Sequence, residues 1–204
     1  MSRARPTYTL PPIAGPIAPT HAGDPPLAHW AGDAPNLLDA AFRWPTRDEG
    51  LPAATPLAIW SGWISDEDDP APGPPQTSPR TWMPAARATL EQRLIEARNM
   101  GLTLALRPHA SHVISDVPGV LDLTRRHAHV RVLLDPCAML TGDMLSRAHD
   151  HVRRILGDLA PLTDPLAALL AVVMPEPPPR DFLALLDELV PPHIPLVGGA
   201  PGAR

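Results

Sequence analysis

The sequence predicts an α/β protein built around a parallel β-sheet. The first observation is the stretch Leu102–Asp135, where the apolar runs Leu102–Leu106 and Val130–Leu134 flank a short helical pattern that Asp116 can cap. Two buried strands joined by a helix form a βαβ unit, whose strands must be parallel. The second observation is that strand and helix patterns alternate along most of the chain, as they do in α/β proteins.

The segment that follows the first 56 residues begins this alternation. Leu57–Trp60 (LAIW) is the first clear strand pattern, and it ends at Ser61-Gly62. Pro84 is expected to begin a helix, because proline is favoured in the first turn, and Gly101 is expected to end it. The apolar residues of this helix recur at helical spacing and would form one buried stripe: Ala88, Leu90, Leu94, Ile95 and Ala97.

The chain beyond the βαβ unit continues the pattern. Thr141 or Asp143 is expected to cap a third helix, and Gly157 is expected to stop it. The run Leu166–Met174 is expected to be a buried strand, although its Ala and Leu residues leave a helix open. The last expected elements are the helix Asp181–Val190 and the strand Ile194–Val197. A barrel and an open doubly wound sheet both fit this order, and neither the GxGxxG nor the GxxxxGK[ST] motif is present to favour the open sheet.

Residues 1–56 form a proline-rich segment, which is expected to pack on the α/β domain of residues 57–204 as irregular wrapping or to lack order in part. Proline removes backbone donors and disfavours the helical conformation at the preceding residue. Short strands are expected at Tyr8–Leu10 and Ile13–Ala18, and a short helix is expected at Asn36–Trp44. The chain as a whole is expected to form a single domain.

Length and composition restrict the classes of protein that fit. A chain of 204 residues can bury one sizeable core. The net charge is −5 and all 17 basic residues are scattered arginines, which argues against a nucleic-acid-binding surface. Cys137 is the only cysteine, so neither an intramolecular disulfide nor a cysteine-based metal site is expected. No apolar run is long enough to span a membrane and the first residues lack a signal-peptide pattern, so a cytoplasmic location is expected.

Polar residues follow the two strands of the βαβ unit at the points where the strands end. Arg107 and His109 follow the first strand, and Asp135 follows the second. Parallel sheets carry their functional groups at the carboxyl ends of the strands, so these residues are the first candidates for a site. His109 and His112 are spaced HxxH, which suits general acid–base catalysis or metal binding. The alternative is that both are loop residues bound to water or to the backbone.

Trp60 and Trp63 bracket the end of the first clear strand. Their rings are suited to stack on a sugar, and the alternative is that they fill a core that the proline-rich segment leaves open. Cys137 lies just after the end of the second strand of the βαβ unit and is expected to be a small buried thiol, since no neighbour in the sequence is a base that would activate it.

Four consecutive segments carry a family resemblance: AARATLEQRLIEARNMG, LTLALRPH, DVPGVLDLTRR and VRVLLDP. This order of helix, strand, helix and strand resembles the xylose isomerase-like TIM-barrel superfamily, which includes sugar phosphate isomerases and epimerases and the TIM-barrel apurinic endonucleases. The resemblance covers residues 57–199, with a further echo in RDFLALLDELVPPHIPLVGG. It implies a parallel (β/α) TIM-barrel-like fold, which is expected to be incomplete or irregular because such barrels typically need ~250 residues.

The superfamily holds a divalent metal with carboxylates and histidine at the strand ends, and the metal polarises a carbonyl or phosphate oxygen. Asp135 matches the expected aspartate, but Arg107 stands where the metal-binding glutamate is expected and Ala138 where a histidine often follows. Gly198 or Gly199 stands where the final glutamate is expected. The resemblance therefore implies a lost metal site, with a divalent metal disfavoured and no cofactor. Arg107 is then expected to pair with Asp135, as an anion-binding site or as a structural ion pair.

Two classes of function follow from this resemblance. The first is a divergent, non-catalytic protein with a binding or partner-docking role. The alternative is a sugar isomerase or epimerase-like enzyme that acts on a small carbohydrate by proton transfer. In that enzyme Asp135 and His109 would be catalytic, and the substrate would bind Arg107, His112, Trp60 and Trp63. The expected ligand is a small carbohydrate or another small anion; nucleic acid and membrane partners are not expected, and the exposed edges of an unclosed barrel would favour a homodimer.

Overall fold

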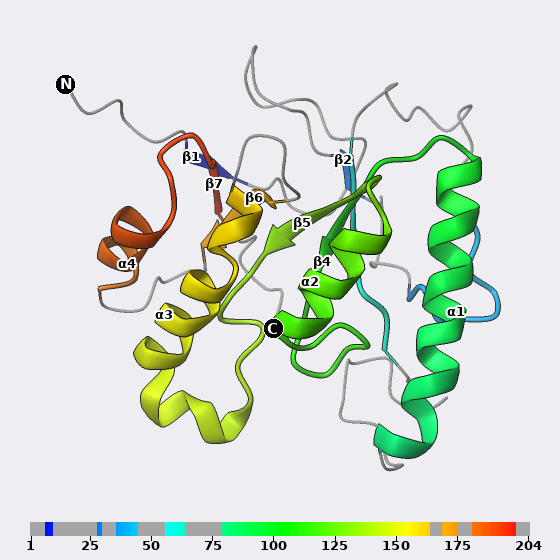
Figure 1. Ribbon diagram of the computed structural model, residues 1–204, viewed down its shortest axis with the longest axis horizontal. Helices are drawn as coiled ribbons and strands as arrows, with labels where there is room; N and C mark the ends of the chain where they lie inside the picture. Colours follow the sequence, from blue (N-terminus) through cyan, green and yellow to red (C-terminus); the bar gives the residue numbers. More distant parts are fainter. Residues whose placement is uncertain are drawn as a thin grey trace.

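The computed structural model (Figure 1) describes residues 7–9, 28–29, 36–44, 56–63, 79–163, 169–174 and 181–198. Within these residues seven strands form one sheet, and every neighbouring pair of strands is parallel. The strands are β1 (Thr7–Thr9), β2 (Ala28–His29), β3 (Leu57–Trp60), β4 (Leu104–Arg107), β5 (Val130–Leu134), β6 (Leu169–Met174) and β7 (Leu196–Gly198). The helices are α1 (Pro79–Asn99), α2 (Val117–Arg126), α3 (Ala148–Asp158) and α4 (Phe182–Leu189), with the 3-10 helices η2 (Gly142–Arg147) and η3 (Ala160–Thr163). The expected α/β class with a parallel sheet is confirmed.

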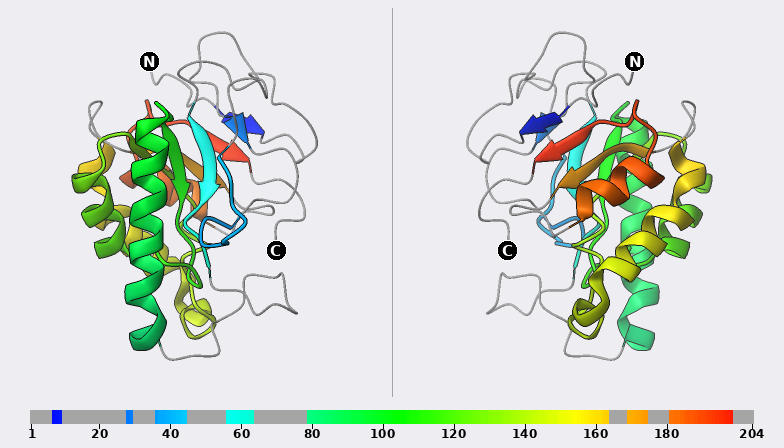
Figure 2. Two further views of the ribbon diagram at one scale, coloured as in Figure 1. Left: turned by 90° about the vertical axis from the view of Figure 1, so that its right-hand side faces the viewer. Right: turned by 90° about the vertical axis from the view of Figure 1, so that its left-hand side faces the viewer.

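The strands lie in the order β1-β7-β6-β5-β4-β3-β2. From β3 to β7 each strand therefore lies beside the one that precedes it, and the crossovers from β2 to β7 all step in the same direction. Crossovers of one hand and one direction place their helices on one face of a sheet, and Figure 2 shows α1, α2 and α3 on the same side. A doubly wound sheet has helices on both faces. The order is that of a (β/α) barrel cut between β1 and β2, and no pairing within the described residues joins these two edge strands.

Most expected strands are present. Leu57–Trp60 and Val130–Leu134 are strands with the expected bounds. The run that left a helix open is a strand over Leu169–Met174, between β5 and β7 in the sheet. The strand expected at Tyr8–Leu10 is β1, which pairs with β7 at one edge of the sheet. The strand expected at Ile13–Ala18 lies outside the described residues.

The first long helix begins earlier than expected. α1 starts at Pro79, and Pro84, the expected first residue, lies inside it. Pro79 occupies the first helical position that proline favours, so the start signal belongs to this residue. The expected end at Gly101 is confirmed: Gly101 has φ 71°, and the Leu102 N–H donates to the Ala97 carbonyl at 2.9 Å, as in a Schellman motif. None of the described helices combines the length and the apolar character that crossing a membrane requires.

The expected start of α2 is confirmed, whereas the expected ends of the third helix are not. Asp116 caps α2 as expected, since its Oδ1 accepts a hydrogen bond from the Gly119 N–H at 2.8 Å. The third helix departs from expectation, because Thr141 precedes the 3-10 helix η2 and makes no side-chain cap bond. Gly157 does not stop α3, which runs one residue further to Asp158. Gly157 does not take the positive φ with which a glycine ends a helix.

The prediction of a helix at Asn36–Trp44 is wrong, because this segment contains two short turns and no helix. Asn36 Oδ1 accepts a hydrogen bond from the Leu38 N–H at 3.1 Å, and Asp39 Oδ1 accepts one from the Ala41 N–H at 2.7 Å. Side chains that bond to a backbone N–H two residues ahead offer the chain an alternative to helical hydrogen bonds. The helical spacing of the apolar residues was therefore outweighed by two local turns.

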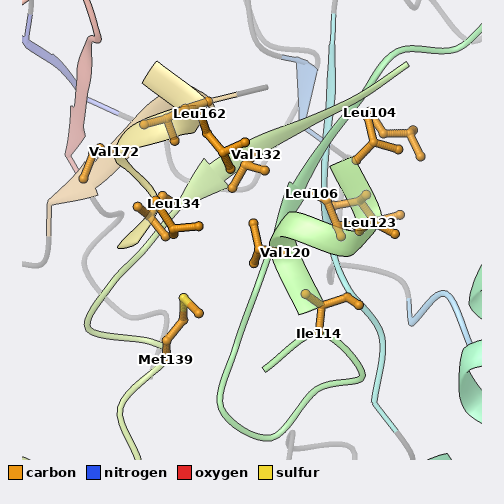
Figure 3. Packing of buried hydrophobic residues seen from close by; sticks show 14 of the residues in the cluster. Leu104, Leu106, Ile114, Val120, Leu123, Val132, Leu134, Met139, Leu162 and Val172 are labelled. Carbon is orange, nitrogen blue, oxygen red and sulfur yellow. The ribbon is translucent and has the colours of Figure 1, made fainter. Parts of the chain in front are cut away.

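The hydrophobic core lies between the sheet and its helices. Figure 3 shows Val120 and Leu123 of α2 against Leu106 and Val132 of the sheet, and all four belong to one buried cluster. Successive strand residues point to opposite faces. The residues between the core positions therefore lie on the second face of the sheet, away from the helices, and are also buried: Ala58, Ala105, Leu133 and Val173.

Truncation of a core side chain should lower the free energy of unfolding more than truncation of a surface side chain. Leu106 is 1% exposed, and we expect Leu106→Ala to lower the free energy of unfolding by about 3 kcal/mol, because it removes buried methyl groups and leaves a cavity. Leu145 is 62% exposed, so Leu145→Ala is the matched control and should change the free energy by less than about 0.5 kcal/mol. Urea denaturation followed by circular dichroism measures both. Equal losses would contradict the placement of β4 in the core.

Candidate functional site

Strand alternation brings side chains of different chemistry to one edge of the second face. Trp60 and Arg107 are register partners at the ends of β3 and β4, and Asp135 directly follows β5. Each of the three lies two residues after a residue of the second face, so all three point away from the helices. The earlier residues are Ala58, Ala105 and Leu133, respectively. The expected gathering of polar residues at the carboxyl ends of the strands is therefore present.

An ion pair between Arg107 and Asp135 lies at the centre of this edge. Arg107 Nη2 donates to Asp135 Oδ2 at 2.5 Å, and the side chains are 17% and 8% exposed. The second carboxylate oxygen, Oδ1, accepts a hydrogen bond from the Ala138 N–H at 3.0 Å. Each oxygen of the carboxylate therefore accepts one hydrogen bond, and the expected pairing of these two residues is confirmed.

The guanidinium of Arg107 also stacks on the ring of Trp60. The Arg107 Cζ lies 4.1 Å from the centroid of the Trp60 ring, which is a cation–π geometry. The Nε atom of Arg107 is buried and has no hydrogen-bond partner among the described residues. Buried donors are rarely left without a partner. A water or a ligand group that reached this buried donor would supply the missing acceptor.

The loop that follows β4 folds back over the end of β3. The His109 N–H donates to the Ile114 carbonyl at 3.1 Å, and the His112 N–H donates to the His109 carbonyl at 2.9 Å. The Ile114 carbonyl also accepts from the hydroxyl of Ser61, which is fully buried, at 3.3 Å. The Val113 N–H donates to the carbonyl of the residue after Ser61 at 3.0 Å. These bonds carry both histidines of the HxxH pattern to Trp60.

Four rings, Trp60, Trp63, His109 and His112, form an aromatic cluster beside the ion pair. The Trp63 and His112 rings are stacked, with centroids 5.1 Å apart and planes 23° apart. Both imidazoles meet Trp60 edge to face, with centroids at 5.6 Å for His109 and 5.2 Å for His112. The two imidazole centroids are 4.6 Å apart. The structure thus brings together all six residues that the sequence singled out for a site.

His112 is the most buried member of the aromatic cluster. It is 2% exposed, and neither ring nitrogen has a hydrogen-bond partner among the described residues. Burial is the largest cause that lowers the pKa of His112 from the ordinary 6.5 to about 3, and the nearby His109 and Arg107 contribute the smaller part of this shift. His112 is therefore a neutral imidazole with one donor and one acceptor available inside the cluster.

His109 is also neutral, but one of its nitrogens is occupied. Burial lowers the pKa of His109, and the charge of Asp135 opposes this shift while that of Arg107 adds to it. His109 Nδ1 accepts a hydrogen bond from the Ser111 N–H at 3.1 Å. An accepting Nδ1 assigns the proton of the neutral ring to Nε2. His109 can therefore donate a hydrogen bond to a ligand from Nε2, while its basic nitrogen faces the backbone.

The residues around Asp135 differ from the metal ligands of the superfamily that the sequence resembles. Both oxygens of Asp135 are engaged, and the position where the resemblance expects the glutamate carries the cation of Arg107. Within the described parts of the chain, no three His, Cys, Asp or Glu side chains are grouped so that they could hold an ion. Burial, with the charge of Asp135 as the smaller cause, raises the pKa of the half-buried Cys137 thiol to about 12, which keeps it protonated.

Sequence reasoning did not single out Asn36 or Gly62 as contributors to the site. Gly62 has φ 85°, which favours glycine, and a Cβ atom there would lie 2.9 Å from Leu38 Cγ. Asn36 bonds to the backbone of Trp63, 27 residues away in the chain. A glycine two residues after the end of a strand was the one local signal, since no sequence pattern connects Asn36 with Trp63.

Comparisons with known proteins add little to this geometry. No protein-family model and no curated protein matches the chain. Among solved structures, the apo form of the 3-keto-D-glucoside 4-epimerase YcjR from E. coli is similar over 71% of this chain, with 18% identity and a TM-score of 0.39. The chain spans 56% of that enzyme. At this TM-score the similarity carries no argument about function, so the site must be judged by its own chemistry.

Loss of one charge of the ion pair should destabilise the protein. We expect Asp135→Asn to lower the free energy of unfolding by about 2–3 kcal/mol, because the largely buried Arg107 loses its counter-charge. Adding Arg107→Met to this variant should recover part of the loss, since no unpaired charge remains. The exposed pair between Arg153 and Glu188 provides the control, and Arg153→Gln should cost less. A double variant as unstable as Asp135→Asn alone would contradict the electrostatic explanation.

The buried histidine should make stability depend on pH. The folded pKa of His112, about 3, lies below the ordinary 6.5, so the unfolded chain binds the proton more readily. Its neutral form contributes stability above pH 6.5, and this contribution is lost as pH falls towards 3, at up to about 1.4 kcal/mol per pH unit. Nuclear magnetic resonance titration of the histidine ring protons, assigned with His112→Gln, measures this pKa directly. A midpoint for His112 near pH 6 would contradict its burial.

Proposed function

We propose that the protein is a non-catalytic binding protein on a scaffold derived from a (β/α) barrel, and that it binds a small neutral carbohydrate at the edge formed by Trp60, Arg107 and Asp135. The sequential order of the parallel strands β2 to β7 and the helices on one face support the barrel origin. The observation that carries the functional proposal is that the candidate bases at this edge are either hydrogen-bonded already or weakly basic.

Proton transfer needs a basic atom that is free and has a suitable pKa. Both carboxylate oxygens of Asp135 accept hydrogen bonds, and the Nδ1 of His109 accepts one from the backbone. His112 has free ring nitrogens, but burial lowers its pKa to about 3, which makes it a weak base near neutral pH. Each acid–base candidate from the sequence is thus engaged or weakly basic, which supports binding without catalysis.

The groups that remain available suit a polyhydroxylated ligand. Arg107 Nε has an unused donor, His109 has Nε2–H, and His112 has one donor and one acceptor. Sugar hydroxyls both donate and accept, and the rings of the aromatic cluster offer apolar faces to the carbon skeleton. The charges of Arg107 and Asp135 cancel and both imidazoles are neutral, so the site is electrically balanced. This balance favours a neutral carbohydrate over an anion.

A second candidate is a sugar isomerase or epimerase-like enzyme. One observation favours it: His112 has two ring nitrogens without partners among the described residues, and it lies beside His109, one of the expected catalytic pair. In such an enzyme a ligand would have to raise the pKa of His112 or release Asp135 from Arg107 before a proton could be moved. The two candidates differ in whether a bound sugar exchanges a carbon-bound proton with solvent.

The test combines ligand binding with proton exchange. We expect neutral pentoses and hexoses, screened by thermal shift and by the indole and histidine resonances, to raise the melting temperature and perturb the aromatic cluster. In D₂O the bound sugar should gain no deuterium at the carbon next to its carbonyl group. The double variant Arg107→Met/Asp135→Asn should lose binding, whereas Arg126→Gln, at a salt bridge between α1 and α2, should retain it.

Three outcomes would overturn parts of the proposal. Deuterium incorporation that depends on Asp135 or His109 would establish the enzyme instead. Stabilisation by inorganic phosphate and not by neutral sugars would replace the carbohydrate with an anion bound to Arg107. Stoichiometric zinc, manganese or magnesium in the purified protein, with a large stabilisation by the same ion, would show that the residues around Asp135 hold a metal.

A further inference from the structure

The side-chain amide of Asn36 makes two hydrogen bonds to the backbone of Trp63. Asn36 Nδ2 donates to the Trp63 carbonyl at 2.6 Å, and the Trp63 N–H donates to Asn36 Oδ1 at 3.0 Å. Two residues that exchange hydrogen bonds in this way are held as neighbouring strands hold each other. A single side-chain amide therefore acts as the strand partner that Trp63 lacks beyond the end of β3.

The chain next to Trp63 is fixed as well. Gly62 approaches the segment of Asn36 so closely that a Cβ atom would lie 2.9 Å from Leu38 Cγ. On the other side, the Gly62 carbonyl accepts a hydrogen bond from the Val113 N–H at 3.0 Å. Trp63 is thus set between the segment that carries Asn36 and the loop that carries His112. Its ring stacks on His112, which shields this imidazole from water on one face.

We propose that Asn36 is a positioning residue of the candidate site, which holds Trp63 against His112 and thereby closes one wall of the aromatic cluster. The role as a wall for ligand rests on the proposed binding function, whereas the clamp on Trp63 does not. The side-chain hydrogen bonds of Asn36 go to the backbone of Trp63 and to the neighbouring Leu38 N–H, so its influence on the site passes through Trp63.

The segment that carries Asn36 has a separate anchor on α1. Arg93 Nε donates to the Leu37 carbonyl at 3.3 Å, and Arg93 Nη2 donates to the Asp39 carbonyl at 3.2 Å. Leu37 is fully buried, and the Arg93 guanidinium lies 5.3 Å from the centroid of the Phe42 ring. Removal of the Asn36 amide should therefore free Trp63 while the segment itself stays on α1, which makes the clamp separable from general stability.

The test uses Asn36→Ala and Asn36→Asp in the full chain, with Asp39→Ala as the matched control. Asn36→Asp keeps an acceptor but loses the donor and sets a charge against the Trp63 carbonyl. Asp39 bonds to the Ala41 N–H in the same segment and does not bond to Trp63. We expect both Asn36 variants to shift the ring-current-displaced protons of His112 towards ordinary positions. The pKa of His112 should also rise by at least about one pH unit, because water reaches the ring.

Sugar binding separates the two proposals. If the wild-type protein binds a neutral sugar, both Asn36 variants should bind it at least about tenfold more weakly, a loss of roughly 1.4 kcal/mol, and Asp39→Ala should bind it unchanged. Displaced His112 signals in a protein that binds no sugar would retain the clamp and overturn the proposed function. His112 signals and pKa unchanged in both Asn36 variants, or changed equally in Asp39→Ala, would overturn the role of Asn36.

Discussion

The ion pair between Arg107 and Asp135 is the constraint on which the site depends. It joins the ends of β4 and β5, and it places a permanent cation at the carboxyl edge of the sheet. A guanidinium cannot lose its charge in a protein. Groups next to it must therefore be anionic, which Asp135 satisfies, or neutral, which both histidines satisfy. The electrical balance of the whole edge follows from this one pairing.

The aromatic cluster is a consequence of the same pairing and of the fold around it. Trp60 is the register partner of Arg107, so the alternation that aims the guanidinium at Asp135 also lays the indole along its face. The two imidazoles then pack on the edges of Trp60, in a region already short of water. Burial and positive charge both disfavour an imidazolium there. Neutral histidines are thus the expected state beside a paired arginine.

Local signals predicted the parts of the structure that local physics decides. Val130–Leu134 is a strand because its β-branched and apolar residues suit a strand buried on both faces, and Asp116 caps α2 because its carboxylate lies next to the first free N–H groups. Arg107 and Asp135 were predictable as a pair once two parallel strands were placed side by side. The bond from Asn36 to Trp63 and the burial of His112 were not, since both depend on contacts with residues far along the chain.

The features that weaken the site for proton transfer are those that suit it for binding. A general base must keep a free lone pair and must become charged at little energetic cost. The basic nitrogen of His109 instead accepts a hydrogen bond from a backbone N–H, and His112 packs against the rings of Trp60 and Trp63. A binding site gains from the same arrangement, because donors fixed by neighbours lose little entropy when a ligand arrives. Arg107, stacked on Trp60 and tied to Asp135, is such a donor. The pairing of Arg107 with Asp135 is therefore the feature on which the proposed binding function rests.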